Sequence, residues 1–292
     1  MKNVVDAIVP DWIAFGKEAL SRAGIEEGKE ECERILMKLL ACDRFELYAD
    51  FPAGRVSGVE RKFRDILSKR VQRIPLAYLL GVAYFWKETL FVTPECLIPR
   101  PETEILIERV LETLGDRKAS HFSFLDIGTG SGAIGVSILR ECPRARGTFL
   151  DVSRGALAVA RTNVERCGFE NRAQFVHGDL FDGLGPGAGS WDVMVSNPPY
   201  LAAADWNGVQ EELKSEPREA LDGGADGLDF YRRITAQAGE YLVPEGMLAL
   251  EVGQGQSGVV SKWLHNAGYD NIQRFRDYSG IERVVIARKG GF

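Results

Sequence analysis

From about residue 102 onward, short apolar runs alternate with segments of helical length, and this alternation is the strongest constraint on the fold. Strands are predicted at residues 122–127, 148–150, 175–177, 193–196, 247–252 and 284–287, and helices at 132–141 and 153–166. Strands that alternate with helices of this length predict a largely parallel α/β sheet with both faces covered. Ligands of such sheets bind beyond the carboxyl ends of the strands.

The first 80 or so residues show helical periodicity instead. Apolar residues recur at helical spacing, most clearly at Cys32, Ile35, Leu36, Leu39 and Leu40 and more loosely at Val4, Ile8, Phe15 and Leu20. Between residues 84 and 98, aromatic and β-branched residues alternate around Pro94, which predicts a hairpin. We therefore expect a small helical domain at residues 1–82, a β-hairpin linker at 83–100 and the α/β domain at 101–292.

Charge and cysteine usage exclude several classes of protein. The formal net charge of −6 argues against a protein that works mainly by neutralising nucleic-acid phosphates. The five cysteines and three histidines are scattered, with no CxxC pair, so we expect reduced thiols and no metal site. No run approaches the roughly 18 apolar residues of a membrane span, and Asp6 and Asp11 interrupt the region where a signal peptide would be apolar. We expect a cytoplasmic monomer with no membrane association.

A basic cluster precedes Pro75 on a stretch with helical character. Its members are Arg61, Lys62, Arg64, Lys69, Arg70 and Arg73. Two interpretations stay open: a solvated helix face, or a docking surface for an acidic partner.

A glycine-rich loop follows the first predicted strand of the α/β domain. It consists of Gly128, Thr129, Gly130, Ser131 and Gly132, and it opens a helix. Glycines let the backbone approach a ligand closely, and a helix N-terminus offers free N–H groups. Residues 130–135 also satisfy the dinucleotide pattern GxGxxG, with an acidic residue at the expected distance, so an NAD-dependent oxidoreductase is a rival interpretation.

Acidic residues around the loop favour S-adenosylmethionine over NAD. Asp126 lies two residues before the first glycine, where it can order the loop. Asp151, after the second strand, can accept hydrogen bonds from the ribose diol of either cofactor. After the third strand, Asp179 can hold an adenine amino group and Leu180 can cover the ring.

The segment Asn197, Pro198, Pro199 and Tyr200 ends the fourth predicted strand and indicates the chemistry. Two successive prolines lack N–H donors, so the Asn197 side-chain oxygen and the Pro198 carbonyl can both accept from one NH2 group. Holding both N–H bonds orients a delocalised nitrogen towards a methyl donor and favours its pyramidal transition state. The Tyr200 ring can stack on the planar group that carries this nitrogen. A hydride-transfer enzyme has no evident use for this tetrapeptide.

This tetrapeptide does not choose between substrates, because N6-adenine methyltransferases of nucleic acids face the same planar NH2 group. A nucleic-acid amine methyltransferase is therefore the leading alternative, and a protein that binds S-adenosylmethionine without catalysis is a weaker one. The acidic balance counts against the first, and the intact tetrapeptide counts against the second.

Further segments make the chain closely similar to the HemK/PrmC family of protein-(glutamine-N5) methyltransferases. They are residues 75–81, 97–104, 126–132, 151–153, 196–200, 216–221, 226–228, 250–253 with Gln256, and 280–283. The resemblance implies a Rossmann-like class I S-adenosylmethionine-dependent methyltransferase domain preceded by a small helical domain. It implies methylation of the glutamine of the Gly-Gly-Gln motif in class I peptide-chain release factors, with S-adenosylmethionine as the methyl donor and no stable nucleic-acid partner.

Roles for individual residues also follow from the resemblance. It assigns residues 128–132 and Asp151 to the cofactor, Leu180 to the adenine region, and residues 197–200 to the glutamine amide. It places Arg100 and Thr103 near the substrate. The alternative for this last segment is that Thr103 and Glu104 cap a helix that starts there. The helical domain is expected to help recognise the release factor.

Overall fold

The computed structural model describes residues 8–49, 57–185 and 189–290. By its internal contacts the chain divides into two compact units. The first is residues 1–81 with residues 210–215, and the second is residues 82–209 with residues 216–292. Val4 of the predicted helical pattern lies outside the described residues.

The first unit is helical. Its helices are α1 Ile8–Arg22, α2 Gly28–Leu40, α3 Arg44–Leu47, α5 Val59–Val71 and α6 Leu76–Leu80. The apolar stripe of α2 is buried at Cys32, Ile35 and Leu36, as its spacing predicts. Phe15 departs from the looser α1 pattern, because it is 46% exposed and lies under the guanidinium of Arg64.

A buried ion-pair network ties residues 210–215 to this unit. Arg70 is 5% exposed and pairs with Glu31 at 2.8 Å and with Glu212 at 2.9 Å. Arg73 pairs with Glu212 at 2.8 Å and also donates to the carbonyls of Ala23 and Gly24. Two members of the predicted basic cluster therefore hold the fold together and are not available to a partner.

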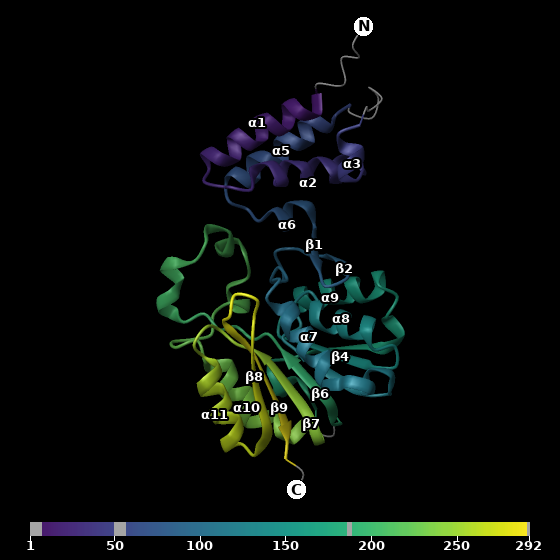
Figure 1. Ribbon diagram of the computed structural model, residues 1–292, viewed down its shortest axis with the longest axis vertical. Coiled ribbons are helices and arrows are strands. Elements are labelled where there is room, and N and C mark those ends of the chain that lie inside the picture. The colour runs from purple at the N-terminus through teal and green to yellow at the C-terminus, as the bar shows by residue number, and fades with distance from the viewer. Residues whose placement is uncertain (1–7, 50–56, 186–188, 291–292) are drawn as a thin grey trace. The chain divides into compact units, whose positions relative to one another are not determined.

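The second unit is built around a seven-stranded sheet (Figure 1). Its strands are β3 Ser123–Ile127, β4 Arg146–Asp151, β5 Ala173–His177, β6 Trp191–Ser196, β7 Leu242–Glu251, β8 Tyr269–Arg276 and β9 Glu282–Lys289. The order across the sheet is β5-β4-β3-β6-β7-β9-β8. Strands β3 to β7 run parallel, and β9 is antiparallel to both β7 and β8.

Two apolar cores cover the two faces of this sheet. Helices α7 Thr103–Leu114, α8 Ala133–Glu141 and α9 Arg154–Arg166 pack on one face, and α10 Asp229–Tyr241 and α11 Ser257–Asn266 pack on the other (Figure 1). Successive strand residues alternate between the cores, with Phe124 in the first and Leu125 in the second. The predicted class I methyltransferase fold is confirmed.

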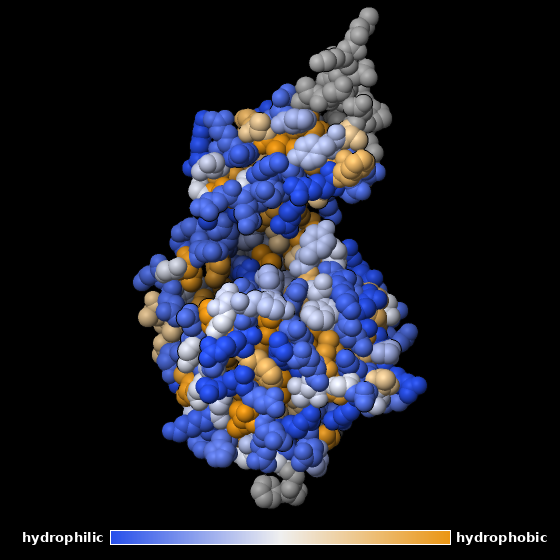
Figure 2. Space-filling view, viewed as in Figure 1, coloured by the Kyte–Doolittle hydropathy of each residue, from blue (hydrophilic) through white to orange (hydrophobic). Residues whose placement is uncertain are grey.

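The hairpin of β1 Val82–Phe85 and β2 Glu88–Phe91 precedes the sheet and pairs antiparallel, as predicted. Short 3₁₀ segments occur at Gly115–Ala119, Glu170–Arg172, Leu180–Gly183, Ala203–Gly208, Glu211–Ser215 and Arg218–Ala220. Hydrophilic side chains dominate the face of both units seen in Figure 2. None of the described helices is long and apolar enough to cross a membrane.

Candidate active site

A cavity of about 290 Å³ lies in the second unit at the carboxyl ends of its parallel strands. The ends of β3, β4 and β6 contribute Ile127, Asp151 and Ser196 to its wall. Strand order reverses at β3, because β4 lies on one side of it and β6 on the other. Ligands of α/β sheets bind at this switch point.

The glycine loop forms one wall of the cavity. Gly128, Gly130 and Gly132 have φ values of +68°, +55° and +81°, which residues with a side chain rarely adopt. A Cβ on Gly128 or Gly130 would meet open space, and both residues line the cavity. Thr129 and Ser131 are buried in the loop, and neither they nor Gly132 line the cavity.

Asp126 holds this loop from beneath, as predicted. It is fully buried, and its Oδ2 accepts from the Thr129 hydroxyl at 2.6 Å and from the Gly135 N–H at 3.0 Å. Oδ1 has no hydrogen-bond partner among the described residues. Burial raises the pKa of Asp126 to about 7, against the two hydrogen bonds, which lower it.

This raised pKa predicts a pH-dependent stability. The carboxyl of an unfolded chain ionises near 3.8, whereas folded Asp126 keeps its proton to about pH 7. The folded state binds more protons in that window, so the free energy of unfolding falls as the pH rises through it. Asp126→Asn removes this contribution, and the stability of the variant relative to wild type should improve by about 2 kcal/mol from pH 5 to pH 7.

Urea unfolding at several pH values measures this difference. Asp116→Asn is the matched control, because Asp116 is exposed and lies outside the cavity. A difference between wild type and Asp126→Asn that stays constant over this range would show that Asp126 ionises normally in the folded protein.

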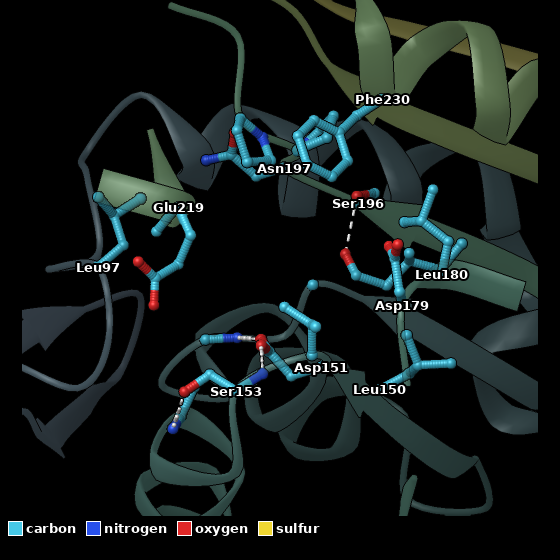
Figure 3. A pocket seen from close by; sticks show the side chains of 18 of the residues that line it. Leu97, Leu150, Asp151, Ser153, Asp179, Leu180, Ser196, Asn197, Glu219 and Phe230 are labelled. Carbon is cyan, nitrogen blue, oxygen red and sulfur yellow. Dashed lines mark hydrogen bonds between the residues drawn. The ribbon is translucent and has the colours of Figure 1, made fainter. Parts of the chain in front are cut away.

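Asp151 ends β4 and faces the cavity (Figure 3). Its Oδ2 accepts from the Gly130 N–H at 2.8 Å and its Oδ1 accepts from the Ser153 N–H at 2.9 Å. Each carboxylate oxygen has a second lone pair for a ligand hydroxyl. Asp151 is 8% exposed, and this burial raises its pKa.

The turn after β5 supplies the far wall. Leu180 lines the cavity and is buried, with φ of +50°, a strained value for a residue with a side chain. Asp179 also lines the cavity and pairs with Arg233 of α10 at 2.9 Å. Gly178 and Gly183 approach so closely that a Cβ on Gly178 would lie 2.1 Å from the Gly183 Cα, so this tight turn requires glycine at both positions.

Three residues of the segment after β6 line the cavity: Asn197, Pro198 and Pro199. The Asn197 Nδ2 donates to the Thr103 hydroxyl at 3.0 Å. Tyr200 does not line the cavity; it packs against the core that contains α10 and α11, and its carbonyl accepts from Gln256 at 3.1 Å. Burial raises the pKa of the Tyr200 hydroxyl to about 12. Its stacking on a substrate amide stays a prediction.

Arg100 and Thr103 also lie outside the cavity lining. Arg100 pairs with the buried Glu216, which also accepts from the Ile98 N–H at 3.0 Å. The alternative capping role for Thr103 and Glu104 is wrong, because Glu102 is the N-cap of α7 and makes no side-chain cap bond. Glu104 instead accepts from the Trp86 N–H at 2.7 Å.

Sequence reasoning missed several lining residues: Glu95, Cys96, Leu97, Pro217, Glu219, Ala220, Phe230 and Arg233. Figure 3 shows the Glu219 carboxylate directed into the cavity between Leu97 and Asp151. The segment that contains Glu219 carries part of the family resemblance, and this was the one signal that could have placed it at the site. Phe230 and Arg233 belong to α10, which the strand and helix assignments did not include.

The cavity wall is acidic. Its ionisable carboxylates are Glu95, Asp151, Asp179 and Glu219, and Arg233 is the one Lys or Arg among its described lining residues. Such a wall favours a cation over a pyrophosphate. Among the residues that the structure describes, no group of three or more His, Cys, Asp or Glu side chains is placed to hold a metal ion.

Comparison with known proteins agrees with this geometry. Residues 102–226 match the methyltransferase small domain, and residues 11–81 match the PrmC N-terminal domain. A methyltransferase from Pyrococcus furiosus, 20% identical, covers 76% of this chain and 99% of its own, with a TM-score of 0.54, and so shares the fold.

Curated relatives are more similar in sequence. The release factor glutamine methyltransferase of Geobacter sulfurreducens is 39% identical over 97% of this chain and 96% of its own length. That of Caulobacter vibrioides is 37% identical over the same shares. Identity at this level over nearly the whole chain shows common membership: the chain belongs to the release factor glutamine methyltransferase family.

Proposed function

We propose that this enzyme transfers a methyl group from S-adenosylmethionine to the side-chain amide nitrogen (N5) of the glutamine in the Gly-Gly-Gln motif of class I release factors. The observation that carries the proposal is the position of Asn197. Its side chain lines the same cavity as the positive-φ glycines and Asp151. The residue proposed to hold the substrate amide and the residues proposed to hold the cofactor therefore face the same cavity. The names of the curated relatives support the same substrate.

The residues present suit S-adenosylmethionine. Gly128 and Gly130 leave room where a Cβ would project, and the Asp151 carboxylate at the cavity wall can accept from ribose hydroxyls. Asp179 and Leu180 line the same cavity and can hold the adenine, and the four carboxylates suit a ligand that carries a sulfonium and an ammonium group. The same carboxylates would repel the pyrophosphate of NAD, which argues against the oxidoreductase interpretation.

The cofactor supplies an electrophilic methyl group. The chain's own residues hold the nucleophile: the Asn197 oxygen and the Pro198 carbonyl accept the two N–H bonds of the substrate amide. This contribution is one of positioning and electrostatics, and it is largest as the nitrogen loses planarity. No base is needed before attack, because the nitrogen becomes acidic once it is alkylated.

A nucleic-acid amine methyltransferase is the alternative with the same chemistry. The enzyme with radiolabelled S-adenosylmethionine should label a purified release factor and leave duplex and single-stranded DNA unlabelled. Label on DNA and none on the release factor would establish the alternative.

We further propose that residues 1–82 recognise the release factor, that residues 83–100 link them to the catalytic residues 101–292, and that the enzyme acts as a cytoplasmic monomer. Within the basic cluster, Arg61, Lys62, Arg64 and Lys69 are exposed. Arg64 pairs with Glu60, and Arg70 and Arg73 hold the helical unit together. Arg61, Lys62 and Lys69 are therefore the exposed charges of the cluster that form no ion pair within the described residues and can meet a partner.

Reversing these three charges together to Glu tests the docking proposal. We expect the apparent KM for intact release factor to rise about 3- to 150-fold, from roughly 0.2–1 kcal/mol for each of the three charges. Activity on a short Gly-Gly-Gln peptide should not change. The matched control reverses Arg144, Arg166 and Lys262, which are exposed in the second unit. An equal effect on both substrates would make the cluster ordinary solvated surface.

A further inference from the structure

Glu251 is a buried carboxylate beside the proposed substrate site. Strand β7 pairs in parallel with β6, and the register Ser196 to Leu250 brings Glu251 next to Asn197. Glu251 is 1% exposed, and its Oε2 has no hydrogen-bond partner among the described residues. The roles proposed above for the cavity residues do not use it.

The Thr103 and Asn197 side chains are hydrogen-bonded to each other beside Glu251. The Asn197 Nδ2 donates to the Thr103 Oγ1 at 3.0 Å. Both side chains lie near enough to the Glu251 carboxyl to lower its pKa as hydrogen-bond donors. Burial acts more strongly and raises that pKa to about 7. The Arg283 charge lowers it, and the Glu102 charge raises it.

Donor and acceptor capacities determine the orientation of the Asn197 amide. The Thr103 oxygen accepts from Asn197, so its single hydroxyl proton is left to donate, and the Glu251 carboxylate, when ionised, is an acceptor beside it. The NH2 end of the Asn197 amide is then held on the protein side. Its Oδ1 remains for the cavity, where a substrate N–H needs an acceptor. If the Asn197 amide were rotated, its NH2 group would face the substrate N–H, and two donors cannot bond. The substrate would then lose one of its two hydrogen bonds.

We propose that Glu251 is a positioning residue that, directly and through Thr103, holds the Asn197 amide with its oxygen towards the substrate nitrogen. The inference rests on the proposed function, since it gives the orientation that this chemistry requires. The end of β7 is well anchored for this task. The Tyr231 hydroxyl donates to the Glu251 carbonyl at 2.9 Å, and the Val252 N–H donates to the Arg283 carbonyl at 2.7 Å.

Steady-state kinetics on a Gly-Gly-Gln peptide test the proposal with four variants. Glu251→Leu removes the acceptor, and Glu251→Gln keeps an acceptor oxygen of the same size. Thr103→Val removes the hydroxyl, and Thr103→Ser keeps it. We expect Glu251→Leu and Thr103→Val to lower kcat about 10- to 100-fold, less than loss of a direct contact, with cofactor affinity within about twofold of wild type. Glu251→Gln and Thr103→Ser should recover most of the loss.

A double-mutant cycle separates positioning from a general structural effect. If Glu251 acts through Asn197, then Glu251→Leu should add less than about threefold to the defect of Asn197→Ala. Full additivity would overturn the proposal. A Glu251→Leu variant with the same kcat as an active wild-type enzyme would also overturn it. A wild-type enzyme that binds the cofactor and leaves the glutamine unmodified would overturn the proposed function itself, and this inference with it.

Discussion

Asn197→Ala should lower kcat on a Gly-Gly-Gln substrate by about 10² or more, by analogy with removal of one preorganised polar group from an active site. In the proposed mechanism, the Asn197 oxygen accepts a substrate N–H bond most strongly as the nitrogen becomes pyramidal, so the loss should fall on the transition state. Cofactor affinity, measured by calorimetry, should change much less, because the glycine loop and Asp151 form the proposed cofactor wall.

Replacement by aspartate sharpens this prediction. The Asn197→Asp variant would keep an acceptor oxygen and lose the donor that Asn197 gives to Thr103. We expect partial activity from Asn197→Asp and almost none from Asn197→Ala. Asn266→Ala is the control, because Asn266 is exposed at the end of α11, outside the cavity. Activity of the Ala variant within a few-fold of wild type would remove Asn197 from the mechanism.

The second large effect is expected on cofactor binding. Asp151→Ala should weaken binding of S-adenosylmethionine by roughly 1.5–3 kcal/mol, the range for hydrogen bonds to a charged group. That loss corresponds to about 10- to 150-fold in Kd. Part of it reflects the loop, because Asp151 also accepts from the Gly130 and Ser153 N–H groups.

Calorimetry on Asp151→Ala, with Asp116→Ala as the exposed control, measures this loss. Asp151→Asn keeps one acceptor oxygen and should lie between wild type and Asp151→Ala. Unchanged affinity in Asp151→Ala, or tight binding of NADH by the wild type, would contradict the cofactor assignment.

The parallel strands could be predicted because each is a short apolar run, a signal that neighbouring residues carry without any tertiary contact. Runs such as residues 122–127 are apolar on both sides, which is typical of strands buried under two helical layers. Helices α10 and α11 and strand β8 were not predicted. In β8 most residues are partly or fully exposed, so an apolar run is missing where this edge strand lies.

The candidate site was predicted where backbone constraints mark it and missed where only tertiary contacts build it. Gly128 and Gly130 can be recognised in the sequence because glycine tolerates positive φ values, and the two prolines because they lack a backbone N–H donor. Glu95 and Phe230 give no such local signal, and the fold alone brings them to the cavity. The basic cluster shows the same limit, because a sequence cannot distinguish exposed Arg61 from buried Arg70.

The most direct test of the central claim is the position of the methyl group. Intact class I release factor should be incubated with the enzyme and S-adenosylmethionine, digested, and sequenced by mass spectrometry. We predict a single added methyl group on the side chain of the Gly-Gly-Gln glutamine, and no methylation of a release factor in which that glutamine is replaced by alanine. A methyl group on any other residue, or an unmodified glutamine beside a methylated nucleic acid, would contradict the account.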